Sequence, residues 1–246
     1  MPADAHAPMH SVAPNSDHPV LVFVPTYADR SAIPHIAAEV AQLGAGYRAL
    51  IVDDGSDPPV DRPDERCLHV RLNANYGLGV STQIAFHHAL RWRYEALVRV
   101  DADGQHALSD IPRLLEALKT ADLVVGVRTN EDRSNTLDVG ARRAMKAYFN
   151  FVARLMTGGG APRDVNSGLF AANVVAMQRL NAVPLERFPE PQIAITACRA
   201  GLRVVSVSVQ QRPRGEGRSS INVTAALGMF FRFNVFALTE LMRPRR

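Results

Sequence analysis

The sequence is poor in cysteine, and this scarcity excludes two classes of protein. Only Cys67 and Cys198 occur among 246 residues. Two thiols so far apart in the chain provide neither a disulfide framework nor the close ligand spacing of a zinc site. A reducing, cytoplasmic compartment is therefore the expected location.

Long apolar runs without charges are also missing. Residues 1–19 contain several prolines and histidines but no apolar block, so we predict a disordered leader there rather than a secretory signal peptide. Residues 221–246 are largely apolar, but Arg232 and Glu240 interrupt them before they reach the about 18 residues expected of a membrane span. No membrane-spanning helix is predicted.

The C-terminal segment nevertheless has the pattern of an amphipathic helix with a basic end. One helical face carries Leu227, Phe231, Val235, Leu238 and Met242. Two interpretations stay open. The helix packs on the domain or in a homo-oligomer, or it lies peripherally on the inner face of a membrane with its basic residues on anionic lipid.

The sequence also lacks the motifs of two further classes of protein, dinucleotide oxidoreductases and nucleic-acid-binding proteins. A dinucleotide oxidoreductase requires Gly-x-Gly-x-x-Gly directly after the first strand, but Pro25-Thr26-Tyr27 occupies that turn. The basic residues are scattered and no stacking motif or reading helix is present, so nucleic acid is not an expected partner. The net charge of +4 suits anionic partners such as nucleotides or lipid head groups, and equally a solvated surface.

What the sequence does contain is a regular alternation of strands and helices. Strands are expected over residues 20–24, 47–52, 68–72, 97–100 and 123–127, with an edge strand over 202–209. Helices are expected over 31–44, 77–90 and 140–157 and from residue 110 onward, the first of them capped by Ser31. This alternation predicts an α/β domain with a mostly parallel central sheet.

Acidic pairs follow two of the strands. Asp53 and Asp54 end one, and Asp101 and Asp103 end another. Carboxyl ends of parallel strands meet at the edge that binds ligands, and close carboxylates favour a hard cation that also contacts substrate phosphates. The pattern therefore predicts a metal-assisted enzyme acting on a phosphorylated compound. Alternatively, Asp53 and Asp54 cap the following turn, since Asp-Gly is typical of turns.

Four motifs, at residues 24–27, 52–56, 73–79 and 101–106, resemble in order and spacing those of the family 2 glycosyltransferases. The resemblance covers about residues 20–220 and is greatest to the dolichyl- and polyprenyl-phosphate sugar synthases. It implies the GT-A fold, a Rossmann-like three-layer sandwich, and an inverting transferase that uses a nucleotide-diphosphate sugar with Mg²⁺ or Mn²⁺. The implied acceptor is a polyprenyl phosphate. The alternatives are a soluble or polymeric hydroxyl acceptor, and a non-catalytic nucleotide-sugar-binding relative.

The resemblance also implies residue roles. Nucleotide-sugar binding is expected of Pro25, Tyr27, Asp53, Asp54, Gly77, Gly79, Asp101, Arg128 and Arg212. Metal ligation is expected of Asp101, Asp103 and Gln105. The expected catalytic residues are Asp103, Glu190 and Asp164, the last two as acceptor-side carboxylates that could instead cap helices. The loop after residue 211 is longer than in the family, so Arg214 or Arg218 could replace Arg212 at the phosphate.

Overall fold

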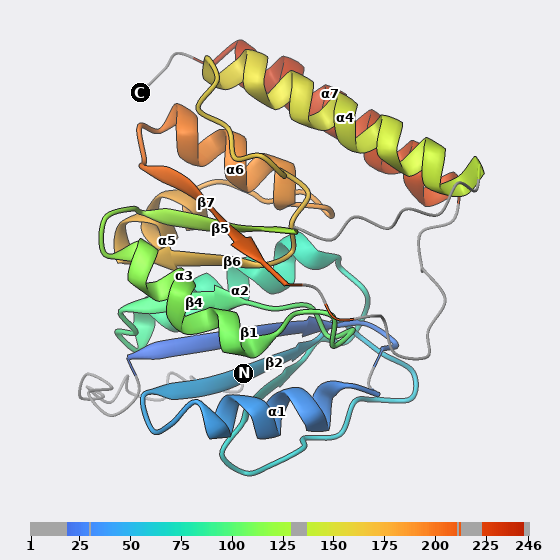
Figure 1. Ribbon diagram of the computed structural model, residues 1–246. Helices are drawn as coiled ribbons and strands as arrows, with labels where there is room; N and C mark the ends of the chain where they lie inside the picture. The colour runs from blue at the N-terminus through green and yellow to red at the C-terminus, as the bar shows by residue number, and fades with distance from the viewer. Residues whose placement is uncertain (1–18, 30, 129–136, 211, 213–222, 244–246) are drawn as a thin grey trace, which may run out of the picture.

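The computed structural model describes residues 19–29, 31–128, 137–210, 212 and 223–243 (Figure 1). The strands are β1 (Val20–Thr26), β2 (Tyr47–Asp53), β3 (Leu68–Arg71), β4 (Ala96–Arg99), β5 (Leu123–Arg128), β6 (Phe170–Asn173) and β7 (Val204–Val209). The helices are α1 (Ile33–Gln42), α2 (Leu78–Arg91), the 3₁₀ turn η1 (Leu108–Asp110), α3 (Ile111–Leu118), α4 (Leu137–Thr157), α5 (Val174–Asn181), α6 (Glu190–Arg199) and α7 (Val223–Leu241). The expected leader and most of the loop after residue 211 lie outside the described residues.

The strands form one sheet in the order β3-β2-β1-β4-β6-β5-β7. Strand β6 runs antiparallel to both of its neighbours, while the remaining pairs are parallel. The mostly parallel sheet and the edge position of β7 are confirmed. Because β6 is reversed, its first residue, Phe170, pairs with Arg99, the last residue of β4. The segment before β6 therefore lies at the carboxyl edge of the parallel strands.

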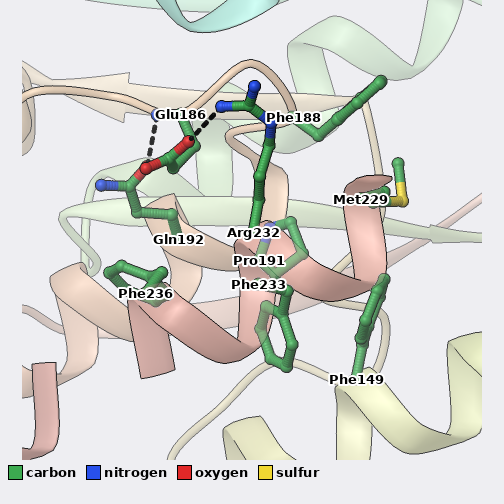
Figure 2. A pocket seen from close by; sticks show the side chains of 9 residues that line it. All are labelled: Phe149, Glu186, Phe188, Pro191, Gln192, Met229, Arg232, Phe233 and Phe236. Atoms are coloured by element: carbon green, nitrogen blue, oxygen red, sulfur yellow. Dashed lines mark hydrogen bonds and ion pairs between the residues drawn. The ribbon is translucent and has the colours of Figure 1, made fainter. Parts of the chain in front are cut away.

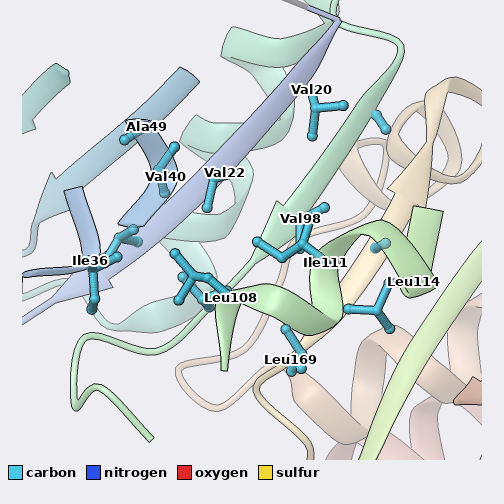
Figure 3. Close-up of a cluster of buried hydrophobic side chains, with 14 of the residues drawn as sticks. Val20, Val22, Ile36, Val40, Ala49, Val98, Leu108, Ile111, Leu114 and Leu169 are labelled. Carbon is cyan, nitrogen blue, oxygen red and sulfur yellow. The ribbon is translucent and has the colours of Figure 1, made fainter. Parts of the chain in front are cut away.

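Helices cover both faces of the sheet, which confirms the three-layer sandwich. Side chains alternate along β1, so Val22 and Val24 point to one face while Leu21 and Phe23 point to the other. Helices α1 and α3 bury the first face, where Ile36, Val98, Ile111 and Leu114 pack together with Val22 (Figure 3). Helices α2, α5 and α6 bury the second face. Strand β1, near the middle of the sheet, is thus buried and apolar on both sides, as in parallel sheets covered on both faces.

Helices α4 and α7 lie side by side outside α6 (Figure 1). Phe149 and Ala153 of α4 pack with Phe233 and Phe236 of α7 and with Ile195 of α6. The C-terminal helix is present, but its amphipathic character is not confirmed. Its outward face is also apolar and carries the exposed side chains Leu227, Phe231, Val235, Leu238 and Met242. No helix within the described ranges combines the length and hydropathy needed to cross a membrane.

The predicted cap of the first helix is wrong. Helix α1 begins at Ile33 after Ala32, and the hydroxyl of Ser31 instead donates a hydrogen bond to Asp29. A serine cap accepts a hydrogen bond from the amide two or three residues later. Three residues after Ser31 stands Pro34, which has no N–H to donate. A Ser31 cap could thus use only the N–H of Ile33, and the helix begins at Ile33 instead.

Candidate functional site

The site lies where β1, β2 and β4 end together at one edge of the sheet. Thr26 pairs with Asp53, so the ends of β1 and β2 are level. Strand β4 continues beside β1 until the Val100 N–H donates to the Phe23 carbonyl, 3.0 Å away. The carboxylates that follow these strands therefore share one edge. Pro25 is buried within β1, whereas Tyr27 beyond its end is exposed.

Asp53 is a buried anchor for the chain that follows β2. One carboxylate oxygen accepts from the Ser56 N–H at 2.9 Å and the other from the Val60 N–H at 3.1 Å. Burial alone would raise the pKa of Asp53, but the hydrogen bonds from Ser56 and Val60 outweigh it and hold the pKa below its usual range. The turn-capping interpretation thus describes a contact that Asp53 makes. Its expected contact with the nucleotide stays a prediction.

Asp54 holds a different segment. Its two oxygens accept from the backbone N–H groups of Tyr76 and Gly77, each at 2.8 Å. Asp54 therefore fixes the loop that enters α2 against the end of β2. Since this loop contains one of the four motifs, Asp54 links two of them directly.

The two glycines at the start of α2 have a structural reason that sequence reasoning missed. A Cβ on Gly79 would lie 2.1 Å from the carbonyl oxygen of Glu186, and one on Gly77 would lie 2.5 Å from Cγ of Arg187. The segment before α6 thus passes directly over the start of α2. The contact seen at both glycines is with this segment, and their expected contact with a nucleotide stays a prediction.

The centre of the site is a buried arginine, Arg99, at the end of β4. Its Nη2 donates to Asp101 Oδ1 and to Glu190 Oε1, both at 2.8 Å. The other oxygen of Asp101 lies 3.2 Å from His106 Nε2. Burial opposes ionisation of Asp101, but Arg99 and His106 outweigh it and hold the pKa of this carboxyl far below its usual range. Asp101 is therefore an anion at every physiological pH.

Asp103 and Gln105 lie in the turn that follows. The Gln105 N–H donates to Asp103 Oδ1 at 3.0 Å, and the Gln105 carbonyl accepts from the Arg212 N–H at 2.8 Å. The side chain of Arg212 is directed to Glu39, with Nη1 2.5 Å from Oε1. The backbone before the long loop is thus held beside the acidic motif. Arg214 and Arg218 lie outside the described residues.

The donor set at this turn fits a hard divalent cation. Asp101 and Asp103 provide carboxylate oxygens, and the Gln105 side chain offers an amide oxygen of the same hard type. Among the residues that the structure describes, no group of three or more His, Cys, Asp or Glu side chains is arranged to hold a metal ion. Mg²⁺ requires no such group, because it is usually held by one or two carboxylates, water and substrate phosphates.

Two predicted site residues, Asp164 and Arg128, lie near the antiparallel strand β6: one precedes it and the other ends the neighbouring strand β5. Asp164 is buried, with Oδ2 3.1 Å from Lys146 Nζ of α4 and Oδ1 accepting from the Asn166 N–H at 3.2 Å. Its contacts thus join α4 to the segment before β6, and Arg99 and Asp101 are not among them. Arg128 ends β5, and its buried Nε has no hydrogen-bond partner within the described part of the chain.

The sequence reasoning missed Arg99 altogether, and for His106 it considered only a phosphate contact and not the contact with Asp101. A signal for Arg99 was available, because residues two apart in a strand share one side, which places Arg99 and Asp101 together. A charge in an otherwise apolar strand is itself unusual, since arginine is rarely buried without a partner. The partner, Glu190, is 91 positions away and could not be predicted from spacing.

Comparison with known proteins agrees with this arrangement. The family described as "Glycosyl transferase family 2" matches residues 21–179. An undecaprenyl-phosphate mannosyltransferase of Micrococcus luteus is 28% identical over 239 residues, which are 92% of this chain and 98% of that protein. A polyprenol monophosphomannose synthase of Mycolicibacterium smegmatis is 38% identical over 117 residues, 44% of each chain.

Among solved structures, glucosyl-3-phosphoglycerate synthase from Mycobacterium tuberculosis, in complex with Mn²⁺, UDP and phosphoglyceric acid, is similar with a TM-score of 0.66. It is 18% identical, and the match covers 92% of this chain and 79% of that one. This likeness shows a shared GT-A fold. The match over residues 21–179 establishes that the chain belongs to glycosyltransferase family 2.

Proposed function

We propose that this glycosyltransferase moves a sugar, with inversion, from a nucleotide-diphosphate sugar to a polyprenyl phosphate. The observation that carries the proposal is the pair Asp101 and Asp103 at the carboxyl edge of the sheet, beside the buried Arg99 and Glu190. The acceptor is supported by relatives named for undecaprenyl-phosphate and polyprenol substrates. The catalytic unit is residues 20–220, with residues 221–246 as an added surface element.

The reaction needs no proton removal in this form. An oxygen of the lipid phosphate is already anionic, so it attacks the anomeric carbon directly. The bond from that carbon to the β-phosphate oxygen breaks, and the nucleoside diphosphate leaves with the electron pair. A divalent cation held by Asp101, Asp103 and Gln105 would neutralise the charge that develops on the departing diphosphate.

The protein's own side chains then have distinct tasks. The loop fixed by Asp54 and the turn fixed by Asp53 form the walls of the nucleotide site. Arg128 and Arg212 are the candidates for phosphate contacts. Glu190 and Asp164 are assigned to the acceptor side, and Glu190 would act as a base only if the acceptor were a hydroxyl group.

A small apolar pocket lies next to the start of α6. Phe188, Pro191, Met229, Phe233 and Phe236 line most of it, together with Phe149, Glu186, Gln192 and Arg232. Figure 2 shows Arg232 reaching across the pocket to Glu186, with Nη1 3.5 Å from Oε2. Pro191 directly follows Glu190, so the pocket adjoins the acceptor side of the site. Its volume of about 20 Å³ is close to that of a single water molecule, so a hydrocarbon chain does not fit inside it and the lipid acceptor rests on the named relatives.

The outer face of α4 and α7 supports docking on a membrane. We define the α4–α7 face as the exposed apolar side chains Phe151, Leu155, Leu227, Phe230, Phe231, Val235, Leu238, Leu241 and Met242. Exposed arginines border it at residues 143, 154, 232 and 243, and residues 143–157 and 227–243 contain no exposed acid. Apolar groups flanked by basic ones match an anionic lipid surface. The enzyme is thus proposed to act peripherally on the inner face of the membrane.

Vesicle flotation tests this surface. Binding to vesicles containing phosphatidylglycerol is expected, and the double variant Leu155→Ser and Phe231→Ser should reduce it at least about tenfold, since two large apolar side chains lose their burial. Val175→Ser, which changes an exposed apolar residue on α5, is the matched control and should bind like the parent. If the parent stays in solution as a dimer that the double variant disrupts, the face is instead an interface between copies.

The acceptor is tested with labelled nucleotide sugars and two acceptor classes. Incubation with undecaprenyl phosphate is expected to yield label in the organic phase, dependent on Mg²⁺ or Mn²⁺. Transfer only to soluble or polymeric hydroxyl acceptors would contradict the lipid proposal, and Glu190→Ala should damage that route more. Nucleotide-sugar binding without transfer to any acceptor would favour the binding-only alternative.

A further inference from the structure

The structure assigns Arg99 as a positioning residue that couples the diphosphate side of the site to its acceptor side. One atom, Nη2, donates to Asp101 Oδ1 and to Glu190 Oε1, at 2.8 Å in each case. The inference rests on the proposed function, because that proposal places Asp101 at the diphosphate and Glu190 at the acceptor. It adds that the relative position of the two carboxylates is set by a third side chain.

The surroundings of Arg99 leave it little freedom to move. Its side chain is 2% exposed, and its guanidinium carbon lies 6.0 Å from the centre of the Phe170 ring. Phe170 belongs to β6, the strand paired with β4, so it forms a fixed wall. A guanidinium buried in this way holds its two partners in one geometry.

Asp101 is fixed from its other sides as well. His106 contacts its second oxygen, and the backbone of Gly168 lies so close that a Cβ there would come within 2.0 Å of Oδ2. Only glycine therefore fits at position 168 with Asp101 in this orientation. Three elements, at residues 99, 106 and 168, thus set the orientation of one carboxylate before any substrate arrives.

The hydrogen bonding of Arg99 argues against a purely stabilising role. Its Nε and Nη1 are buried and have no hydrogen-bond partner within the described ranges. Buried donors without partners destabilise a fold, and buried ion pairs contribute little net stability. A buried arginine that served only to stabilise the fold would be expected to form hydrogen bonds with more of its five N–H donors. The arrangement instead uses one donor atom to fix two acids, as expected where geometry matters more than stability.

Removing the guanidinium should have a specific consequence. Without it, Asp101 and Glu190 are two neighbouring carboxylates with nothing between them, and they would repel each other. Asp101 would rotate away from Gly168, and the acceptor side would shift with Glu190. Losses of groups that orient ligands in this way typically lower activity tenfold to a hundredfold.

A double-mutant cycle on the full-length protein tests the coupling. Arg99→Met is expected to lower kcat by about tenfold to a hundredfold in the parent but by less than about threefold in a Glu190→Gln background. Arg99→Lys, which keeps a positive donor, should recover much of the loss and covers the case in which Arg99→Met does not fold. Equal losses in both backgrounds would overturn the coupling.

Arg199→Met is the matched control. Arg199 also has a largely enclosed side chain, 8% exposed, with Nε 3.2 Å from Glu240 Oε1, but it joins α6 to α7 away from the site. It should lower the melting temperature without lowering kcat. If it lowers kcat as much as Arg99→Met does, the effect of Arg99 is one of general stability.

A crystal structure of Arg99→Met provides a readout that needs no acceptor. The inference predicts that the Asp101 carboxylate moves relative to Glu190. Both carboxylates staying within about 0.5 Å of their present positions would overturn it. This result is separable from the proposed function, since failure to glycosylate a polyprenyl phosphate would leave the structural coupling intact.

Discussion

Replacing Asp54 by asparagine should destabilise the protein and weaken nucleotide binding together. Asp54 is buried, and each of its oxygens accepts one backbone N–H at 2.8 Å, from Tyr76 and Gly77. Asparagine keeps one acceptor oxygen but turns an amide N–H₂ toward the second backbone donor. One charge-assisted hydrogen bond is lost and one buried N–H is left without a partner.

The size of the effect follows from these two losses. Hydrogen bonds to charged groups contribute about 1.5–3 kcal/mol and a buried unsatisfied donor costs about 1–3 kcal/mol, so the variant should lose about 2.5–6 kcal/mol of unfolding free energy. For a chain of this length, each kcal/mol shifts the melting temperature by about 2–4 °C. Calorimetry of Asp54→Asn should therefore show a decrease of at least about 5 °C.

Measuring nucleotide affinity shows whether Asp54 holds a loop of the binding site or only stabilises the fold. Asp122→Asn is the matched control, because Asp122 also accepts two hydrogen bonds, from the Arg203 N–H and the Asn173 amide, at the opposite end of β5. Both variants should melt earlier, but only Asp54→Asn should weaken binding of nucleoside diphosphates in isothermal titration calorimetry. The reasoning is refuted if Asp54→Asn melts like the parent, or if it binds nucleotide as tightly.

Three further outcomes are expected. Because the pKa of Asp53 is lowered in the fold, its contribution to stability is complete above the ordinary value of about 3.9 and is lost as the pH falls through the folded value. The melting temperature should thus fall below about pH 4, less steeply in Asp53→Asn, and parallel curves would contradict this. Asp103→Asn should lower Mn²⁺-dependent turnover at least about a hundredfold, while Asp61→Asn, at an exposed position, should not. If the two variants turn over equally fast, Asp103 is not a metal ligand. Burial raises the pKa of Cys67, and that of Cys198 to about 11, so the folded protein should resist alkylation at pH 7.5 until denatured; rapid native labelling would disprove this.

The strands were the most predictable part of the fold. Short apolar runs between turn residues identified β1, β2, β4 and β5, because a strand buried on both faces has few alternatives. The direction of β6 could not be predicted, since a four-residue apolar run reads the same for parallel and antiparallel pairing. The start of α1 was misjudged because the prediction weighed the capping preference of Ser31 and not Pro34, which removes one of the two N–H groups that such a cap can bind.

Site residues could be predicted where they directly follow a strand. Contacts between segments that are far apart in the sequence could not be predicted. Acids after a strand can be assigned to a sheet edge from sequence alone, as with Asp53 and Asp101. The link from Arg99 to Glu190 depends on the position of α6, which only the folded chain gives. The packing role of Gly79 was missed for the same reason. The segment that lies against it is more than 100 residues away in the sequence, so Gly79 was assigned only to nucleotide binding.

A crystal structure with Mn²⁺ and a nucleoside diphosphate tests the central claim most directly. The account predicts the cation at the turn after β4, bound by Asp103 together with Asp101 or Gln105 and by the diphosphate, with the nucleoside beside the loop that Asp54 holds. A diphosphate bound elsewhere, or a cation that contacts neither Asp101 nor Asp103, would contradict it.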